Sequence, residues 1–434
     1  MEHSLKATLK WIASVTITDY GSEGVENEFS GFAHKRYILS LLSQQVGLTR
    51  NQPNVLFDVV DSFARTLSML QPVCLPKFAS SWLEIIANPL FVTLFLVDMD
   101  NAHLAKSRTI YAQLLAQCLK YLAAFKSDNP NRQYMKFYER VLRLVLDLQA
   151  YPEVLYQNAT LLASLVPLHY SQLRNTILCA YPSAMILRDP FAVADCFNHL
   201  PEMTQEADIN SDFKISLPQE LEEKVRSFMG SVFEESFTDL PKLLMDETQL
   251  ISKYNYPVMC SLVLQLGIID IKSLLKNRYS ISEGMVNGGS IMKIFHSICN
   301  EFCNEGRYVF FSALVSQLRY PNLHTHYFMT VLLALYYKQD VTIREIIVRI
   351  LLERLLTYRP HPWGLLVVTI ELVKKTKYEL WEQDFVHASP EIEKLIQRIA
   401  LSCNIILETE FDNEFEAGEA VVTNQIGDVD EKQL

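Results

Sequence analysis

The sequence predicts an all-α fold: an irregular, HEAT-like stack of antiparallel helical hairpins in two halves, with a disordered acidic C-terminal tail. Two observations predict it. Apolar residues recur at helical spacing along most of the chain, and only 13 of 434 residues are glycine while 49% are hydrophobic. No alternating strand pattern of useful length competes. The turns between helical stretches are short, so successive helices can stack as hairpins. No strict repeat is visible, so the stack is irregular.

The helical spacing is clearest in the middle of the N-terminal half. Between residues 110 and 122, apolar side chains recur at intervals of three and four, which is the stripe of an amphipathic helix (Ile110, Tyr111, Leu114, Leu115, Cys118, Leu119 and Leu122). A second stripe runs from 134 to 148. The same reasoning predicts further helices at roughly 32–46, 54–70, 78–97, 153–165, 169–180, 254–273, 288–304, 306–317, 321–338, 341–357, 363–375 and 389–407.

The predicted organisation has four parts, residues 1–186, 187–218, 219–407 and 408–434. The first and third are the helical halves. The second is rich in turn residues, including three X-Pro pairs, and is expected to connect the halves. The last lacks helical periodicity and mixes acids with a few large apolar residues, which is typical of a disordered segment.

The formal net charge of −11 is concentrated in the tail. Residues 408–434 hold nine acids and one lysine, so they carry −8 and leave −3 for the rest of the chain. A nearly neutral body without a basic stripe argues against nucleic acid as a direct ligand, since phosphate binding requires clustered Lys and Arg.

The cysteines and the N-terminus indicate a reducing compartment. Most cysteines stand singly within apolar helical patterns, which suits buried thiols better than a disulfide framework (Cys74, Cys118, Cys179, Cys196, Cys260, Cys299, Cys303 and Cys403). No signal peptide is visible after Met1. The apolar stretches 89–97 and 254–269 are too short or too polar to span a bilayer. We therefore expect a cytoplasmic protein, with the nucleus as a further location, and no membrane partner.

Motifs of enzyme chemistry are missing from the sequence. There is no G-x-S-x-G, no phosphate-cradling glycine loop and no H-E-x-x-H. His324 and His326 are two residues apart, so on a helix their side chains diverge. His296, Cys299 and Cys303 share a helical face that suits a core better than a metal site. We expect no catalytic, metal-binding or cofactor-binding residues, and a hidden hydrolase or metal enzyme is the disfavoured alternative.

Two Pro-bearing turns near the C-terminal end stand out, at residues 317–328 and 359–366. Each joins a polar stretch to a long apolar helical pattern, and proline disfavours helix at the residue before it. Trp363 either anchors its turn onto a neighbouring helix or forms a docking hot spot, because large aromatics dominate such spots. The candidate partner-docking residues are Arg319, Tyr320, His324, Arg359, His361 and Trp363.

These turns also carry a resemblance to a known family. Together with the runs at 76–85, 172–178, 305–355 and 389–395, they resemble the C-terminal superfamily homology domain of the large scaffold subunit, the Not-one protein, of the CCR–NOT messenger-RNA deadenylase complex. The resemblance extends over nearly the whole chain. It weakens after Phe191, and the acidic tail is longer than the family's pattern leads us to expect.

The resemblance implies an all-helical, HEAT-like scaffold without catalytic activity. It implies docking of the Not-box subunits and of short motifs from translational repressors such as Nanos, in messenger-RNA deadenylation, decay and translational repression. Because the resembling region starts close to Met1, we expect either a fragment or a free-standing short paralogue. The second alternative would compete with the full scaffold and damp deadenylation.

Overall fold

The computed structural model confirms the predicted all-α fold. It describes residues 2–21, 29–124, 132–208, 217–230, 240–246, 253–281 and 289–402, and their regular structure consists of α- and 3₁₀-helices with one isolated β-bridge between Met245 and Tyr254. The chain forms two compact units, Met1–Leu372 and Val373–Leu434. The predicted tail, 408–434, lies outside the described residues. The predicted connector between two halves stays a prediction.

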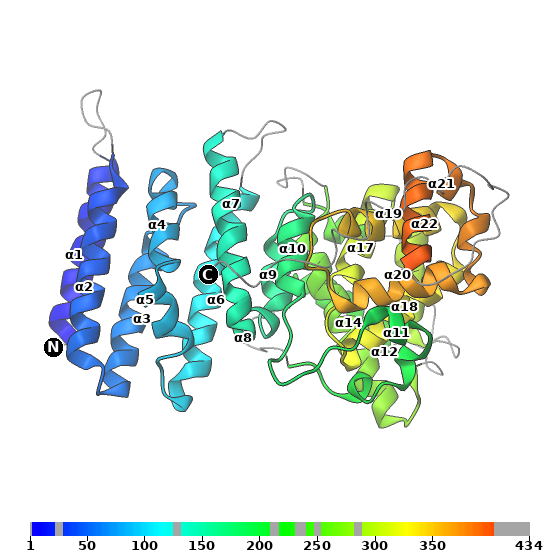
Figure 1. The fold of residues 1–434 in the computed structure, drawn as a ribbon, viewed down its shortest axis with the longest axis horizontal. Helices are drawn as coiled ribbons and strands as arrows, with labels where there is room; N and C mark the ends of the chain where they lie inside the picture. The colour runs from blue at the N-terminus through cyan, green and yellow to red at the C-terminus, as the bar shows by residue number, and fades with distance from the viewer. Residues whose placement is uncertain are drawn as a thin grey trace, which may run out of the picture. The chain divides into compact units, whose positions relative to one another are not determined.

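The first unit begins with long helices that lie side by side (Figure 1). Helix α3 contacts α1, α2 and α6, and α6 in turn contacts α5 and α9, so each layer buries its apolar stripe against the next. The bounds are α1 (Glu2–Gly21), α2 (Gly31–Thr49), α3 (Pro53–Met69), α4 (Ala79–Ile86), α5 (Pro89–Leu96), α6 (Asn101–Ala123) and α7 (Arg132–Asp147).

Shorter helices follow and lead to a second group of long ones. Helix α17 contacts α14, α18 and α19, and the short η4 packs on α18. The bounds are α8 (Pro152–Tyr156), α9 (Ala159–Leu165), α10 (Ser171–Leu178), α11 (Pro190–Val193), η3 (Ala194–His199), η4 (Pro201–Thr204), α12 (Gln219–Gly230), α13 (Leu240–Leu244), α14 (Tyr256–Lys276), α16 (Ser290–Glu301), α17 (Asn304–Val315), α18 (Leu323–Lys338), α19 (Val341–Leu355) and α20 (Trp363–Lys374).

The second unit begins at Val373, within the last turn of α20. It holds η6 (Thr376–Tyr378), η7 (Leu380–Glu382), α21 (Asp384–His387) and α22 (Pro390–Ser402). The indole Nε1 of Trp381 donates to the carbonyl of Val373 at 3.1 Å, and α21 packs against α22. The indole therefore ties η7 to the end of α20.

Most predicted helices are present, with several differences, among them α12 and α13, which were not predicted. The predicted helix at 78–97 is two helices, because Pro89 follows Asn88, whose side chain accepts from the amide of Leu90 and caps α5. The predicted helix at 153–165 is likewise split, into α8 and α9. Helix α1 was not predicted, although its buried Leu5 and Leu9 have helical spacing.

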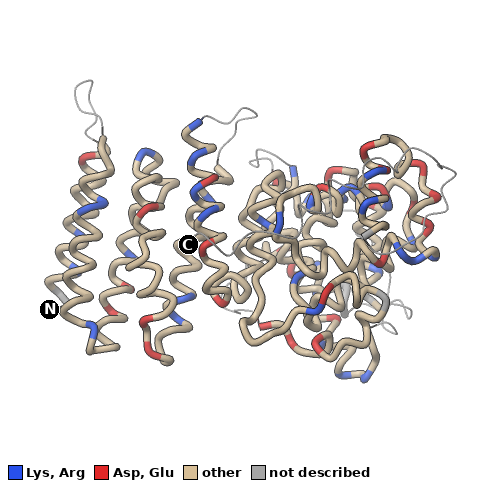
Figure 2. The backbone as a smooth tube through the Cα atoms, in the orientation of Figure 1, with Lys and Arg blue, Asp and Glu red and all other residues tan. Residues whose placement is uncertain are grey.

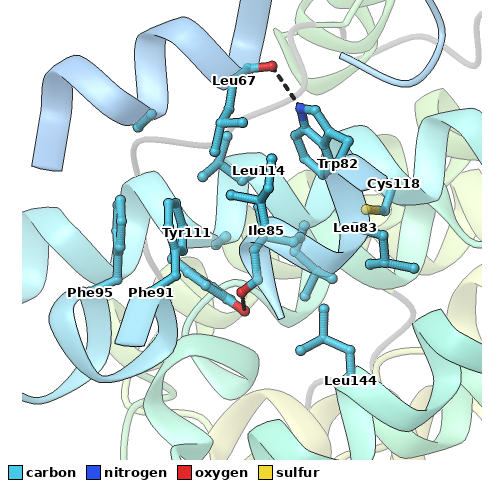
Figure 3. Close-up of a cluster of buried hydrophobic side chains, with 14 of the residues drawn as sticks. Leu67, Trp82, Leu83, Ile85, Phe91, Phe95, Tyr111, Leu114, Cys118 and Leu144 are labelled. Atoms are coloured by element: carbon cyan, nitrogen blue, oxygen red, sulfur yellow. Dashed lines mark hydrogen bonds between the residues drawn. The ribbon is translucent and has the colours of Figure 1, made fainter. Parts of the chain in front are cut away.

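Aromatic side chains with satisfied polar atoms fill the core between α3 and α6 (Figure 3). Trp82 is fully buried, and its Nε1 donates to the carbonyl of Leu67 at 2.8 Å. The hydroxyl of Tyr111 donates to the carbonyl of Ile86 at 2.9 Å. A buried N–H or O–H without a partner would destabilise the fold, so these bonds determine how the two side chains are oriented.

The stretch at 254–269, predicted to be too short or too polar to span a bilayer, lies mostly within a longer helix, α14. Helix α14 has 21 residues and is apolar enough to cross a bilayer by length and composition, so the prediction about its length was wrong. The bent pair of Pro76–Ile86 and Pro89–Leu96 passes the same test only when taken together. Half of the apolar window of α14 is buried against other helices, and it contacts α9, α17 and α18. These contacts are those of a core helix.

Candidate functional site

The two Pro-bearing turns lie where helices of the N-terminal part meet helices of the C-terminal part. Helix α9 contacts α14, and α10 contacts α19. Tyr320 belongs to the same hydrophobic cluster as buried residues between Leu5 and Ala180. We call this contact zone the seam. The two predicted halves therefore share apolar packing.

A reciprocal pair of side chains crosses the seam. Arg354 Nε donates to Asn175 Oδ1 at 2.6 Å, while Asn175 Nδ2 donates to the carbonyl of Arg354 at 2.7 Å and to the hydroxyl of Thr357 at 2.9 Å. Arg354 is 3% exposed, and its Nη2 has no hydrogen-bond partner among the described residues. Burial, and then the charge of Arg174, lower the pKa of Arg354 to about 9.

A second buried guanidinium lies beside the first. Arg174 donates from Nη2 to the carbonyl of Val166 at 2.5 Å and from Nη1 to the carbonyl of Leu168 at 3.2 Å. Its Cζ lies 5.0 Å from the ring centroid of Tyr256 on α14. Carbonyls just past the C-terminal end of a helix attract cations, so this side chain stabilises the end of α9 and binds it to α14.

The first turn is held by buried contacts. Arg319 Nη1 donates to the carbonyl of Tyr156 at 2.9 Å, and the carbonyl of Arg319 accepts from the amide of Gly364 at 2.7 Å. The ring of Tyr320 packs edge-on against Tyr156. A Cβ at Gly364 would approach the Leu318 carbonyl carbon to 3.1 Å, so glycine is needed where the two turns meet.

The two histidines of the first turn have separate surroundings. His324 is half-buried, and burial, followed by the charges of Arg319 and Lys272, lowers its pKa to about 4. His326 Nε2 lies 3.0 Å from Asn198 Oδ1. Across the described ranges, no group of three or more His, Cys, Asp or Glu could hold a metal ion.

The cysteines in the described part of the chain are all free thiols. Cys118, Cys260 and Cys299 are buried and Cys179 is half-buried, which agrees with the sequence reading. Three lie exposed instead (Cys74, Cys196 and Cys303). Cys403 lies outside the described residues.

The second turn combines a buried anchor with exposed residues. Trp363 is 5% exposed, and its Nε1 donates to the carbonyl of Arg188 at 2.8 Å. Of the two roles considered for it, anchoring is the one its contacts support. The Arg359–Pro360 peptide bond is cis. Arg359 is exposed and His361 half-buried.

Burial divides the six predicted docking residues. Arg319, Tyr320 and Trp363 offer a partner almost no side-chain surface, because they hold the seam together. The docking role stays a prediction, and the residues with side-chain surface left for it are the exposed Arg359 and the half-buried His324 and His361. Sequence reasoning missed Leu356 and Tyr358, which are strongly exposed just beyond α19. The signal was their position at the end of the predicted helix 341–357, where its stripe runs out.

A comparison with protein-family models shows which family the chain belongs to. The model described as the CCR4-Not complex component Not1 matches residues 45–400. The chain belongs to the Not1 family. The resemblance first noted in the two turns and the earlier runs is thereby confirmed.

Curated relatives agree with this membership. The chain is 34% identical over 410 residues to the CCR4-NOT transcription complex subunit let-711 of Caenorhabditis elegans, covering 92% of the chain and 15% of the relative. It is 28% identical over 397 residues to the general negative regulator of transcription subunit 1 of Schizosaccharomyces pombe, covering 86% and 18%. The chain thus spans less than a fifth of the length of these relatives.

Solved structures agree in fold. The Not1 superfamily homology domain from Chaetomium thermophilum superposes with a TM-score of 0.80 at 26% identity, covering 92% of this chain and 78% of that one. A Not1 C-terminal domain solved in complex with Not4 gives a TM-score of 0.74 at 20% identity and covers 92% and 81%. The second likeness shows the fold alone.

Proposed function

We propose that this chain is a non-catalytic docking module of the CCR4–Not scaffold. In this role it binds the Not-box subunits of the complex and short motifs of translational repressors such as Nanos. It thereby acts in messenger-RNA deadenylation, decay and translational repression. The observation that carries the proposal is the match of the Not1 family model to residues 45–400.

Two further observations support a docking role. A Not1 C-terminal domain of the same fold has been solved in complex with Not4. Stacked helical layers also present extended surfaces that suit elongated partner segments. Figure 2 shows Lys and Arg distributed along the helices among Asp and Glu, which favours protein partners over a nucleic-acid backbone.

We propose a cytoplasmic location, with the nucleus as a second one. The free thiols of the described cysteines support it, because such thiols persist in a reducing compartment. Fluorescence microscopy of the tagged chain tests this location, and accumulation in secretory vesicles would contradict it.

Gel filtration of the purified chain mixed with the Not-box heterodimer tests the docking role. We expect a shared peak at micromolar concentrations. The helical domain of an unrelated HEAT-like protein serves as the control and should elute alone. Separate elution of the chain and the heterodimer would overturn the proposal.

A further inference from the structure

Helix α7 carries a stripe of cations on its exposed side. Four Lys and Arg side chains are exposed there at a spacing of four, four and three residues, which places them on one face of the helix (Arg132, Lys136, Arg140 and Arg143). Figure 2 shows Lys and Arg at intervals along this helix. We expected no basic stripe on this chain, so α7 departs from that expectation.

These cations lie at the end of the helix where positive charge is unfavourable. Arg132 is the first residue of α7, whereas Asp147 is its last, and no basic residue lies in the last turn. The helix dipole favours acids at the N-terminal end and cations at the C-terminal end. Like charges three or four residues apart also repel each other along a helix surface. The stripe therefore destabilises the helix that carries it, and such a local cost is typical of a functional surface.

Most of these cations lack a counter-charge. Among the described residues, no carboxylate forms an ion pair with Arg132, Lys136 or Arg143. Glu139 is exposed and lies between them in sequence, yet within the described part of the chain it pairs with none of them. Carboxylates supplied by another molecule would offset the repulsion within the stripe.

A shared carboxylate joins the stripe to α2. Glu84 of α4 accepts from Lys35 Nζ of α2 at 2.5 Å and from Arg140 Nη1 at 2.9 Å. Lys35 Nζ and Arg36 Cζ lie 4.9 and 5.9 Å from the ring centroid of Phe32, which is 57% exposed. Arg36 is exposed as well. The cationic surface therefore runs across α2, α4 and α7, with an aromatic ring at its α2 end.

We propose that this surface binds an extended partner segment rich in Asp and Glu. We name it the α2–α7 cationic face (Lys35, Arg36, Arg132, Lys136, Arg140 and Arg143). An extended segment spans several helices, and its carboxylates pair with the cations that lack counter-charges. A nucleic acid fits less well, because it carries a phosphate at every nucleotide while Glu84 and Glu139 interrupt the face. The inference deepens the proposed docking function and rests on it.

A display library of short random peptides, panned on the full chain, tests the face directly. Enriched peptides should be rich in Asp and Glu, and raising the salt concentration should weaken their binding. They should bind the double variant Lys136→Glu/Arg143→Glu about tenfold more weakly than the wild type. Lys293→Glu, at an exposed lysine on α16, is the matched control and should bind as the wild type does.

The single variant Lys136→Glu separates binding from folding. A glutamate at this position removes the repulsion with Arg132 and Arg140, and it lies in the half of the helix where the dipole favours an acid. The variant should therefore melt at or above the wild-type temperature, followed by circular dichroism, while it binds the enriched peptides more weakly.

Several results would overturn the inference. They are enrichment of peptides without acids, wild-type affinity in the double variant, or a lower melting temperature for Lys136→Glu. A further one is binding of a single-stranded RNA oligonucleotide that the double variant loses, without any acidic peptide that binds. That last result would assign the face to nucleic acid instead.

The outcome is separable from that of the proposed function. If the Not-box heterodimer co-elutes with the chain but no acidic peptide depends on this face, the inference falls and the docking function stands. If acidic peptides depend on the face while the heterodimer fails to bind, the face stands and the docking of the Not-box subunits falls.

Discussion

Arg354 and Asn175 hydrogen-bond to each other in both directions across 179 residues of sequence. The guanidinium Nε donates to the Asn175 amide oxygen at 2.6 Å, and the amide nitrogen donates to the Arg354 carbonyl at 2.7 Å. Both residues are buried. This pair links α10 to α19 and places the α19–α20 turn next to the N-terminal helices.

Replacing Asn175 with alanine should destabilise the chain by about 2–3 kcal/mol, because the change leaves the buried Nε–H of Arg354 without its acceptor and removes the two bonds that the Asn175 amide donates. Urea unfolding followed by circular dichroism measures the free energy. Asn51→Ala, at an exposed position after α2, should change it by less than about 0.5 kcal/mol. Equal effects of the two changes would show that the pair contributes nothing.

Trp82→Phe should cost about 2 kcal/mol, since it removes the bond to the Leu67 carbonyl and leaves a space in a fully buried position. Trp11→Phe is the matched control, because Trp11 is 66% exposed on α1 and should tolerate the change within about 0.5 kcal/mol. Thermal melts of both variants compare them. A larger loss at Trp11 would contradict the described core.

Two glycine substitutions should act in opposite directions. A Cβ at Gly267 on α14 would lie 2.3 Å from Phe328 Cζ, so Gly267→Ala should destabilise the chain by about 2 kcal/mol. At Gly47 on α2 a Cβ meets nothing within 4 Å, and alanine should stabilise the helix by up to about 1 kcal/mol. Denaturant titrations measure both. A stabilising Gly267→Ala would contradict the packing of α14 on α18.

Acid should destabilise the fold partly through His324. Its pKa is about 4 in the folded state against a usual 6.5, so the neutral ring is favoured on folding. The stabilisation is therefore complete above pH 6.5 and is lost as the pH falls towards 4. Urea unfolding at several pH values should show a shallower slope for His324→Gln than for the wild type. Parallel slopes would contradict this role.

The fold was predictable because it depends on local spacing. Long stripes such as 110–122 are visible in the sequence alone, whereas the break before Pro89 was not predicted. The contacts of the candidate site were less predictable from the sequence. Arginine is usually exposed, so nothing local indicates that Arg319 is buried against the carbonyl of Tyr156, 163 residues earlier in the chain. Only the folded chain shows which polar residues hold the seam and which, like Arg359, remain on the surface.

The most direct test of the docking role is a crosslinking map of the full chain with the Not-box heterodimer. We predict crosslinks between both Not-box subunits and this chain, made at concentrations where the three co-elute. A map in which the subunits crosslink to each other but nowhere to this chain would contradict the account.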